Sequence, residues 1–349
     1  MSESLTVSRS DKLDRVGMAE KRIVVPMSMC GRANLSPAKL LSHVGDWTWD
    51  LVRQTCGANP YDAWTVSGDP SYLAYIYIRI HASPETPLNS FRFGAELDVA
   101  SRIYAMGSEA VGAIHQLRPK ESVASPLSPT YEAMYGNPDH DSLYVETFNK
   151  WISRSSSGNE SLVKSSPEGF ITDHLPPIPD AHLPPRRYRP ALSAQTFLTP
   201  GDSYEPVISE FVSDYALDRD RDINGVGLVY YAAYFDFAEQ ATTAACIAAG
   251  IENSSMIRSI SGQQIVYLAN CDFNKSVRFN VDISRLWDNP DEFVSNVRMV
   301  RASDQTVLAI CTTQFRLRQA AYMPENGDEP PVRLREARAP VAGENKSEN

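Results

Sequence analysis

Residues 222–239 read Asp-Ile-Asn-Gly-Val-Gly-Leu-Val-Tyr-Tyr-Ala-Ala-Tyr-Phe-Asp-Phe-Ala-Glu, and this stretch decides how the rest of the chain is interpreted. A polar turn containing Gly225 and Gly227 leads directly into a long segment rich in alanine. Glycine permits a tight backbone turn, and alanine is the strongest helix former. The pattern predicts a helix over residues 229–249. Because charge is nearly absent after Glu239, we expect this helix to be buried on almost every side.

The order of elements around this helix occurs twice in the chain. Ser36 suits a helix N-cap and Pro37 suits the first helical position, so an earlier helix is predicted over residues 37–56. Segments with the composition and alternation of strands surround both helices. In the first half they are residues 22–29, 72–81, 96–106, 109–117 and 143–154, and in the second half 208–217, 263–271, 276–283, 293–301 and 307–316. A strand, a turn, a long helix and a four-strand meander therefore form each half.

Composition divides the chain into five segments. Residues 155–200 are dense in Ser, Pro and Gly, which predicts an extended linker without helix or sheet interior. A second Ser/Pro-rich stretch, residues 120–139, is predicted to be an insertion between two strands. The predicted segments are a disordered tail (1–20), a first domain (21–155), the linker (156–200), a second domain (201–320) and a second disordered tail (321–349).

Charge and cysteine content exclude several classes of protein. The net charge of −10 argues against binding to nucleic acid or to membrane surfaces, since both require basic faces. The sequence has neither a signal peptide nor an apolar run of the roughly 18 residues that a membrane span needs. Its 5 cysteines are widely spaced and form no C-x-x-C pair. We interpret them as reduced thiols of a cytoplasmic protein, and we predict no metal site.

The turn at Asn224 carries the chemical information. Hot-dog thioesterases that act on acyl thioesters have a related D-x-D-x-x-G-x-V-Y-x-x-x-Y segment, in which the second acidic residue activates water. Asn224 occupies that position here. An amide cannot take up a proton and can only donate or accept hydrogen bonds. The turn is therefore predicted to hold a thioester without hydrolysing it. The alternative is that Asn224 is only a turn residue, because Asn tolerates left-handed backbone.

Several segments together resemble one known family, the bifunctional acyltransferase/decarboxylase of leinamycin-type polyketide biosynthesis. The resemblance covers residues 22–318. Its segments are PMSMCGRANLS (26–36), SYLAYIYIRI (71–80), FRFGAELDV (91–99), DINGVGLVYYAAY (222–234), IVYLANCD (265–272) and RASD (301–304). It implies an α+β double hot-dog fold, in which two antiparallel sheets each wrap round a long central helix.

The resemblance also implies an activity. The protein is expected to accept methylmalonyl-CoA, to decarboxylate the acyl group and to deliver propionyl to an acyl carrier protein, with no cofactor beyond the coenzyme A of the substrate. The family is credited with a catalytic tyrosine on the strand after the first helix, which aligns with Tyr72, although Tyr75 and Tyr77 are close by. Acyl carrier proteins are acidic, so a basic patch near the mouth of the site is predicted. Whether the chain forms a homodimer stays open.

Decarboxylation of a malonyl thioester requires donors that stabilise an enolate oxygen. The predicted helix start offers the backbone N–H groups of Gly227, Leu228 and Val229, and Asn224 offers its side-chain amide. Gly225 and Asn270, from the two most specific segments, complete this predicted substrate-binding set together with His43.

The roles of Tyr72 and His43 have alternatives. A free phenol has a pKa of about 10, so a nucleophilic Tyr72 needs a nearby cation or base, for which Arg79 and His43 are candidates; otherwise Tyr72 donates a hydrogen bond. His43 could instead serve as a dehydratase base paired with Asp46 or Asp236, or simply be a core or solvated histidine.

Three functions follow from these residues. The leading hypothesis is a decarboxylating acyltransferase with Tyr72 and Asn224 as its catalytic residues. A thioesterase or dehydratase that acts on carrier-bound acyl groups is the second. The third is a non-catalytic acyl-binding protein.

Overall fold

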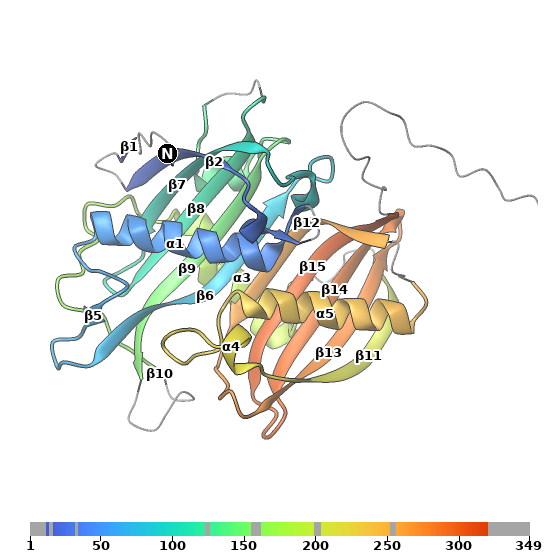
Figure 1. Cartoon of the computed structure of the whole chain (residues 1–349). Helices are drawn as coiled ribbons and strands as arrows, with labels where there is room; N and C mark the ends of the chain where they lie inside the picture. The colour runs from blue at the N-terminus through green and yellow to red at the C-terminus, as the bar shows by residue number, and fades with distance from the viewer. Residues whose placement is uncertain are drawn as a thin grey trace, which may run out of the picture.

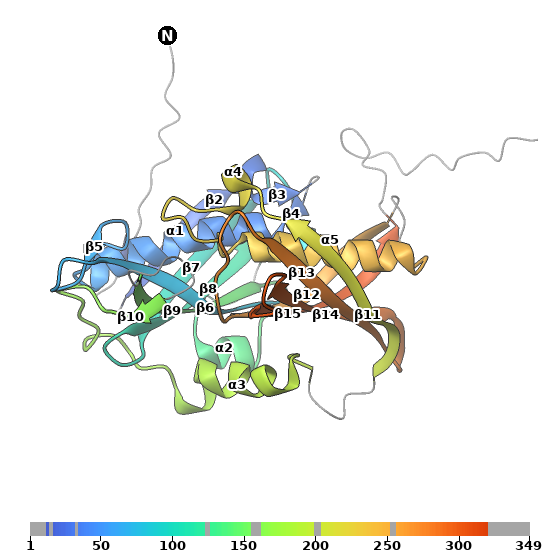
Figure 2. The ribbon, with the colours of Figure 1, turned by 90° about the horizontal axis from the view of Figure 1, so that it is seen from below.

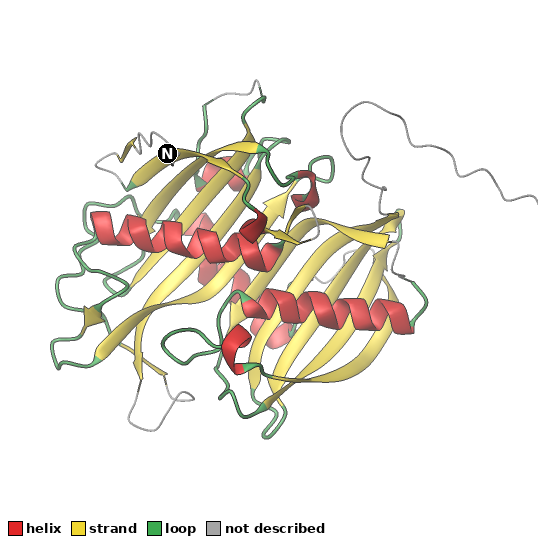
Figure 3. Ribbon diagram, in the orientation of Figure 1, coloured by secondary structure: helices red, strands yellow, loops and turns green. Residues whose placement is uncertain are grey.

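The computed structural model describes residues 12–13, 17–31, 34–122, 126–154, 162–198, 204–251 and 256–319. One large antiparallel sheet runs through the whole of this region (Figures 1 and 3). Helices α1 (Pro37–Thr55) and α5 (Ala233–Ala248) lie on one face of the sheet, and α2 (Tyr131–Tyr135) and α3 (Pro184–Ala194) lie on the opposite face (Figure 2). Most of the two predicted tails lies outside the described residues.

The two halves of the sheet have the same strand order. From the outer edge to the junction, the first half contains β2 (Met18–Val24), β7 (Glu96–Ala105), β8 (Ala110–Pro119), β9 (Leu143–Arg154) and β6 (Pro70–Ala82). From the junction outward, the second half contains β12 (Met256–Tyr267), β15 (Val307–Gln319), β14 (Asn289–Arg301), β13 (Ser276–Leu286) and β11 (Tyr204–Ala216). The repeat predicted from the order of elements is confirmed.

Short strands complete this arrangement. Within the described residues, β1 (Lys12–Leu13), β5 (Ala63–Trp64) and β10 (Leu162–Lys164) pair with β2, β6 and β9, and β3 (Cys30–Gly31) pairs with β4 (Asn34–Leu35).

A long helix packed on an antiparallel meander, present twice, is the double hot-dog fold, so the predicted fold class is confirmed. The two sheets are also hydrogen-bonded to each other. Strand β6 pairs with β12 from Tyr77 opposite Val266 to His81 opposite Gly262, which joins both halves into one sheet of 13 strands. The halves therefore share a ladder of backbone hydrogen bonds as well as side-chain contacts.

Helix α1 forms as predicted. Pro37 stands at its first turn, where the missing N–H removes no hydrogen bond. Leu40, Leu41 and Val44 recur at helical spacing and are fully buried against the sheet. The same hydrophobic core includes Phe235 and Ala238 of α5, so the two long helices share one interior.

Helix α5 differs from its prediction in two ways. It begins at Ala233 instead of residue 229, because the backbone before it is held in a different conformation by the turn. It is also exposed along one side, at Asp236, Gln240 and Ala244, so the expectation of burial on almost every side is wrong. Alanine on the sheet side allows close packing, whereas on the exposed side it reflects helix propensity.

The segment predicted as an extended linker contains helix α3. Its first two residues are Pro184 and Pro185, which occupy the first turn, the place where proline is compatible with a helix. Packing then holds the helix on the sheet, since Arg187 stacks over the Tyr135 ring at 3.5 Å and Ala191 is buried.

A buried polar cluster fixes α2 and α3 to this face. The hydroxyl of Tyr135 donates to the carboxylate of Glu146 on β9, which is fully buried. Arg79 and Arg187 both lie over the Tyr135 ring, and His182 stacks on it with ring centroids 5.0 Å apart. Burial raises the pKa of Glu146, in opposition to the Tyr135 hydrogen bond and to both guanidinium groups.

All five cysteines lie within the described residues, are buried, and form no disulfide. Among the described helices, none combines the length and apolar character that crossing a membrane requires.

Candidate functional site

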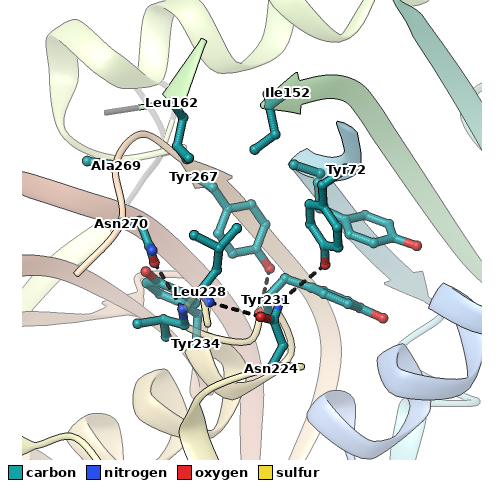
Figure 4. A pocket seen from close by; sticks show the side chains of 13 residues that line it. Tyr72, Ile152, Leu162, Asn224, Leu228, Tyr231, Tyr234, Tyr267, Ala269 and Asn270 are labelled. Carbon is teal, nitrogen blue, oxygen red and sulfur yellow. Dashed lines mark hydrogen bonds between the residues drawn. The ribbon is translucent and has the colours of Figure 1, made fainter. Parts of the chain in front are cut away.

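A cavity of about 70 Å³ lies at the junction of the two halves, where β6 extends beyond its pairing with β12 (Figure 4). Both halves contribute to its wall. The lining residues are Tyr72, Ala74, Tyr75, Ile152 and Leu162 from the first half, with Asn224, Leu228, Val229, Tyr231, Tyr234, Tyr267, Ala269 and Asn270 from the second half and its turn. The sheet junction thus brings together residues more than 150 positions apart.

The turn before α5 is anchored by Asp222. Its buried carboxylate accepts hydrogen bonds from the Tyr215 hydroxyl (2.8 Å), the Asp218 backbone N–H (2.8 Å) and the Arg221 Nε (3.1 Å). With these three donors the carboxylate is occupied structurally. The first acidic residue of the motif therefore shapes the turn and does not face the cavity.

Asn224 is oriented by its own turn. Its Oδ1 accepts hydrogen bonds from the backbone N–H groups of Val226 (3.1 Å) and Leu228 (2.9 Å). These two donors identify the oxygen of the amide and force Nδ2 to the other side. There Nδ2 donates to the Tyr72 hydroxyl at 3.2 Å (Figure 4). The turn role and the cavity-facing role of Asn224, which the sequence presented as alternatives, are thus combined in one side chain.

Tyr72 is a neutral phenol whose proton points away from Asn224. Burial raises its pKa, as does the nearby Tyr230, and the Asn224 hydrogen bond only partly opposes this. Since Asn224 is the donor in their hydrogen bond, the Tyr72 proton stays available, and no described residue accepts it.

A Tyr72 nucleophile would need a nearby cation or base, and neither predicted candidate supplies one. Arg79 lies over the Tyr135 ring on the opposite face of the sheet. The Nε2 of His43 lies 3.3 Å from the Ser28 hydroxyl, and His43 does not line the cavity. The site as folded favours Tyr72 as a hydrogen-bond donor.

The backbone N–H groups predicted as thioester donors are already engaged. That of Gly227 donates to the Asn224 carbonyl (2.8 Å), that of Leu228 to Asn224 Oδ1 (2.9 Å) and that of Val229 to Asn270 Oδ1 (3.0 Å). The prediction that a helix N-terminus offers these groups is corrected, because α5 starts only at Ala233.

The two glycines of the turn do not line the cavity. Gly227 has φ +77°, which explains the requirement for glycine there. Gly225 is exposed, and a Cβ at this position would have no neighbour within 4 Å.

Asn270 supports the cavity wall from a distant part of the sequence. It is buried, its side chain fixes Val229, and its carbonyl accepts a hydrogen bond from Arg301 (2.5 Å). The predicted His43 partners Asp46 and Asp236 lie on α1 and α5 outside the cavity lining. Burial lowers the pKa of His43, and Asp46 opposes this. In the described regions of the chain, no group of three or more His, Cys, Asp or Glu side chains could hold a metal ion.

The cavity lining also includes Tyr75, which the sequence presented only as an alternative to Tyr72, and Tyr231 and Tyr267, which the sequence analysis did not assign to the site. The rings of Tyr75 and Tyr231 stack with centroids 4.1 Å apart. The Tyr231 hydroxyl donates to the Leu41 carbonyl of α1 (2.7 Å), and the Tyr267 hydroxyl donates to the Tyr231 carbonyl (2.9 Å). Tyr231 belongs to the stretch that opened the sequence analysis, so its place in the Val-Tyr-Tyr motif was the available signal.

None of the described residues that line the cavity is charged. Cations lie next to its wall instead. Lys164 on β10 is opposite Ile152, and Lys150 is two residues earlier on the same strand as Ile152. Burial, Lys164 and Arg189 together lower the pKa of Lys150, which places the three cations near one another.

Comparison with known proteins gives the family. The profile of the LnmK N-terminal Hot Dog Fold domain matches residues 20–200, more than half of the chain. The chain belongs to this family. The resemblance to the leinamycin-type family is thereby confirmed. The LnmK-type match includes Tyr72, Tyr75 and the wall from β9 and β10, whereas the Asn224 turn lies beyond it. No curated protein matches the sequence.

Solved structures give the same fold for most of the LnmK-type chain, including the second half, which the family profile does not cover. The chain is similar to a 12:0-ACP thioesterase from Umbellularia californica, with 10% identity, a TM-score of 0.54, and 87% of this chain and 96% of that one covered. It is similar to a protein described as an oleoyl thioesterase from Lactobacillus plantarum (13%, TM-score 0.55, 86% and 98% covered). An acyl-ACP thioesterase from Bacteroides thetaiotaomicron also matches (12%, TM-score 0.52, 86% and 98% covered). At this identity the likeness shows the double hot-dog fold alone.

Proposed function

We propose that the protein is a decarboxylating acyltransferase, which converts a malonyl-type acyl-CoA, with methylmalonyl-CoA as the leading candidate, into an acyl group carried by an acyl carrier protein. Membership of the LnmK-type family and a fold shared with acyl-thioester enzymes support a thioester substrate. The observation that carries the reaction type is the direction of the Asn224–Tyr72 hydrogen bond.

That direction decides what Tyr72 offers a ligand. With an amide at position 224, Nδ2 donates to Tyr72, so the phenol proton is free for a thioester oxygen. With a carboxylate at this position, one oxygen would keep the two backbone donors and the other would accept the Tyr72 proton. The neutral amide therefore makes Tyr72 a donor to substrate.

Decarboxylation uses this donor directly. The bond between the carboxylate and the α-carbon breaks, carbon dioxide leaves, and the electron pair passes into an enolate whose charge rests on the thioester oxygen. The Tyr72 O–H stabilises that oxygen, and a well-placed donor of this kind contributes about 3 kcal/mol. The enolate carbon then takes a proton from solvent. Apolar walls at Ile152, Leu162 and Leu228 offer the substrate carboxylate no partner, which favours its loss as a neutral gas.

Transfer follows at the same carbonyl. The carrier thiol loses its proton to solvent and its sulfur forms a new C–S bond to the acyl carbon. The C–S bond to CoA breaks and the CoA thiolate takes up a proton from solvent, while the Tyr72 donor again faces the developing negative oxygen. Hydrolysis is disfavoured because, among the described residues, the lining includes no Asp, Glu or His to activate water.

The test uses the purified full-length protein with methylmalonyl-CoA and a pantetheinylated carrier protein. Carbon dioxide release and the mass of the carrier are measured together. We expect both products from the wild type and a loss of about 10²–10³ in kcat for Tyr72→Phe, which removes only the donor. Asn224→Asp should lower kcat at least as far, because it captures the same proton and adds negative charge.

Asn224→Ser is the matched control, since it removes the side-chain amide without adding charge. It should retain more activity than Asn224→Asp. Equal activity of Asn224→Asp and wild type, or a wild type that neither releases carbon dioxide nor loads the carrier, contradicts the proposal. Free acid in place of loaded carrier would favour a thioesterase.

A further inference from the structure

We infer that the stacked Tyr75–Tyr231 pair is the end wall of the acyl site and restricts this protein to short acyl groups. The inference rests on the proposed function only in taking an acyl thioester as the ligand. Tyr75 and Tyr231 set the size of the substrate, and Gly45 of α1 leaves the space into which the Tyr231 hydroxyl fits.

The size of the cavity gives the first argument. Its volume of about 70 Å³ is roughly half that of the engineered cavity of about 150 Å³ known to hold a benzene ring. The space between the lining residues is therefore smaller than the one that a six-carbon ring occupies, whereas an acyl group of three or four carbons is compatible with it. The 12:0-ACP thioesterase and the oleoyl thioesterase that share this fold carry names with much longer acyl groups, so fold alone does not set the limit.

The wall itself is rigid. The centroids of the two rings are 4.1 Å apart. Hydrogen bonds hold both the side-chain hydroxyl and the backbone carbonyl of Tyr231. Its hydroxyl donates to the Leu41 carbonyl (2.7 Å), and its own carbonyl accepts from the Tyr267 hydroxyl (2.9 Å). A side chain fixed by one hydrogen bond and a ring contact, on a backbone fixed by a second hydrogen bond, does not rotate aside to admit a longer chain at little cost.

Gly45 leaves the space on α1 that the Tyr231 hydroxyl occupies. A Cβ at residue 45 would lie 1.9 Å from the Tyr231 hydroxyl oxygen and 3.4 Å from that of Tyr75. Gly45 is inside α1 without a positive φ, so helix geometry does not require glycine. The absence of a side chain is instead what lets the Tyr231 hydroxyl reach the α1 backbone.

The region behind the wall is polar. The side chains of Thr48 and Asn149 lie beside the Tyr75 hydroxyl, and Asn149 is opposite Tyr75 in the β6–β9 ladder. An alkyl chain forced past the stack would therefore meet buried polar groups, which is unfavourable. Cavity volume, a fixed wall and a polar region behind it all indicate the same limit.

The test measures binding, so it does not depend on catalysis. S-propyl-CoA and S-octyl-CoA, which are unreactive thioethers, are titrated calorimetrically into wild type and variants. We expect wild type to bind the propyl compound at least about tenfold more tightly than the octyl compound. Tyr231→Ala should reverse this preference, since each methylene buried in the opened space gains about fourfold in affinity.

Two further variants keep the test decisive if Tyr231→Ala does not fold. Tyr231→Leu, which retains apolar volume, should narrow the propyl preference at least threefold. Gly45→Ala introduces a good helix former, but its methyl group would occupy the space of the Tyr231 hydroxyl. It should therefore push the Tyr231 ring into the cavity and weaken propyl binding about tenfold. Tyr188→Leu, on the opposite face of the sheet and outside the cavity, is the matched control and should leave both affinities unchanged.

The outcomes separate the two proposals. If wild type binds propyl and octyl compounds equally, or if Tyr231→Leu and Gly45→Ala leave their ratio unchanged, the size limit is wrong while thioester binding stands. If wild type binds neither compound, the acyl-thioester function itself fails.

Discussion

At the scale of single residues, the two oxygens and one nitrogen of the Asn224–Tyr72 pair show how a structural turn becomes a chemical device. The amide oxygen of Asn224 closes the turn on Val226 and Leu228, and its nitrogen is thereby directed at Tyr72. A turn that any Asn or Asp could form thus determines whether the phenol proton faces the ligand.

The sequence allowed part of this site to be predicted. Asn224 was identifiable because an amide replaces an acid within a local motif, and Tyr72 because a family resemblance aligned it. The engagement of the Val229 N–H was not predictable, because its acceptor Asn270 is 41 residues away and no local pattern relates them. Tyr231 stood in the motif and could have been considered, but its contact with Gly45 was not predictable, because the two residues are 186 positions apart and no local pattern relates them.

A buried histidine gives a residue-scale prediction of pH dependence. His115 is fully buried, with Nε2 3.0 Å from the Thr48 hydroxyl and Nδ1 2.8 Å from that of Ser101. Burial, with a smaller effect of Lys21, lowers its pKa from 6.5 to about 3. Between these values the unfolded chain binds a proton that the folded protein does not. The free energy of unfolding therefore falls as the pH falls from about 6.5 to about 3.

Urea unfolding at pH 7 and pH 5 tests this. The contribution of His115 to the loss between the two pH values should be about 2 kcal/mol. The control is His115→Gln, whose side chain does not titrate. Its free energy of unfolding should be lower than that of the wild type at pH 7, but should fall by about 2 kcal/mol less between pH 7 and pH 5. Equal pH dependence in both proteins would assign the acid sensitivity to other groups.

At the scale of elements, a helix could be predicted where the residues that determine it are neighbours in the sequence. Helix α1 could be predicted within one residue of its end because its capping proline and apolar spacing are local. Helix α3 could not, because proline normally ends helices, and this helix has Pro184 and Pro185 in its first turn and Pro190 in its interior. Contacts with Tyr135 and the sheet then stabilise α3, and these are made by residues about 50 positions earlier.

The β9–β10 hairpin gives an element-scale prediction about the carrier protein. Lys150 and Lys164 lie beside the cavity wall, and we propose that they contact the acidic carrier. The double variant Lys150→Glu/Lys164→Glu should raise the KM for carrier about tenfold at low salt and leave kcat nearly unchanged, because rim charges act mainly on encounter. The difference should shrink as salt is added.

Lys120→Glu is the matched charge reversal. Lys150 pairs with Ala110, at the start of β8, whereas Lys120 follows the last residue of that strand and so lies at its other end. Lys120 forms an ion pair with Glu96. It should leave the KM for carrier unchanged. An equal rise for both variants would indicate a general charge effect and would remove the hairpin as a docking site.

At the scale of the whole molecule, the two predicted domains, residues 21–155 and 201–320, are joined by backbone pairing between β6 and β12 and by one core beneath α1 and α5. We propose that they fold as one cooperative unit. If only the linker connected the two halves, each could unfold independently. A common core instead makes the stability of each half depend on the other.

Hydrogen exchange can measure this coupling. Leu40→Ala in the first half removes a fully buried side chain and should cost about 3 kcal/mol. If the unit is cooperative, the most protected amides of β13 in the second half should lose the same free energy, and Phe235→Ala should have the converse effect on β8. A loss confined to the mutated half, or two transitions in calorimetry, would contradict one-unit folding.

The exposed Gly225 has a consequence for the lifetime of the protein. An asparagine followed by glycine is the pair in which the next backbone nitrogen attacks the side-chain amide most readily, since glycine has no Cβ to obstruct it. Loss of ammonia from Asn224 by this route leaves an aspartate or its isomer, which is the change that reverses the Tyr72 donor. The three hydrogen bonds on the amide therefore also protect it against spontaneous ageing. Alanine at position 225 meets no neighbour and would slow that ageing without disturbing the turn.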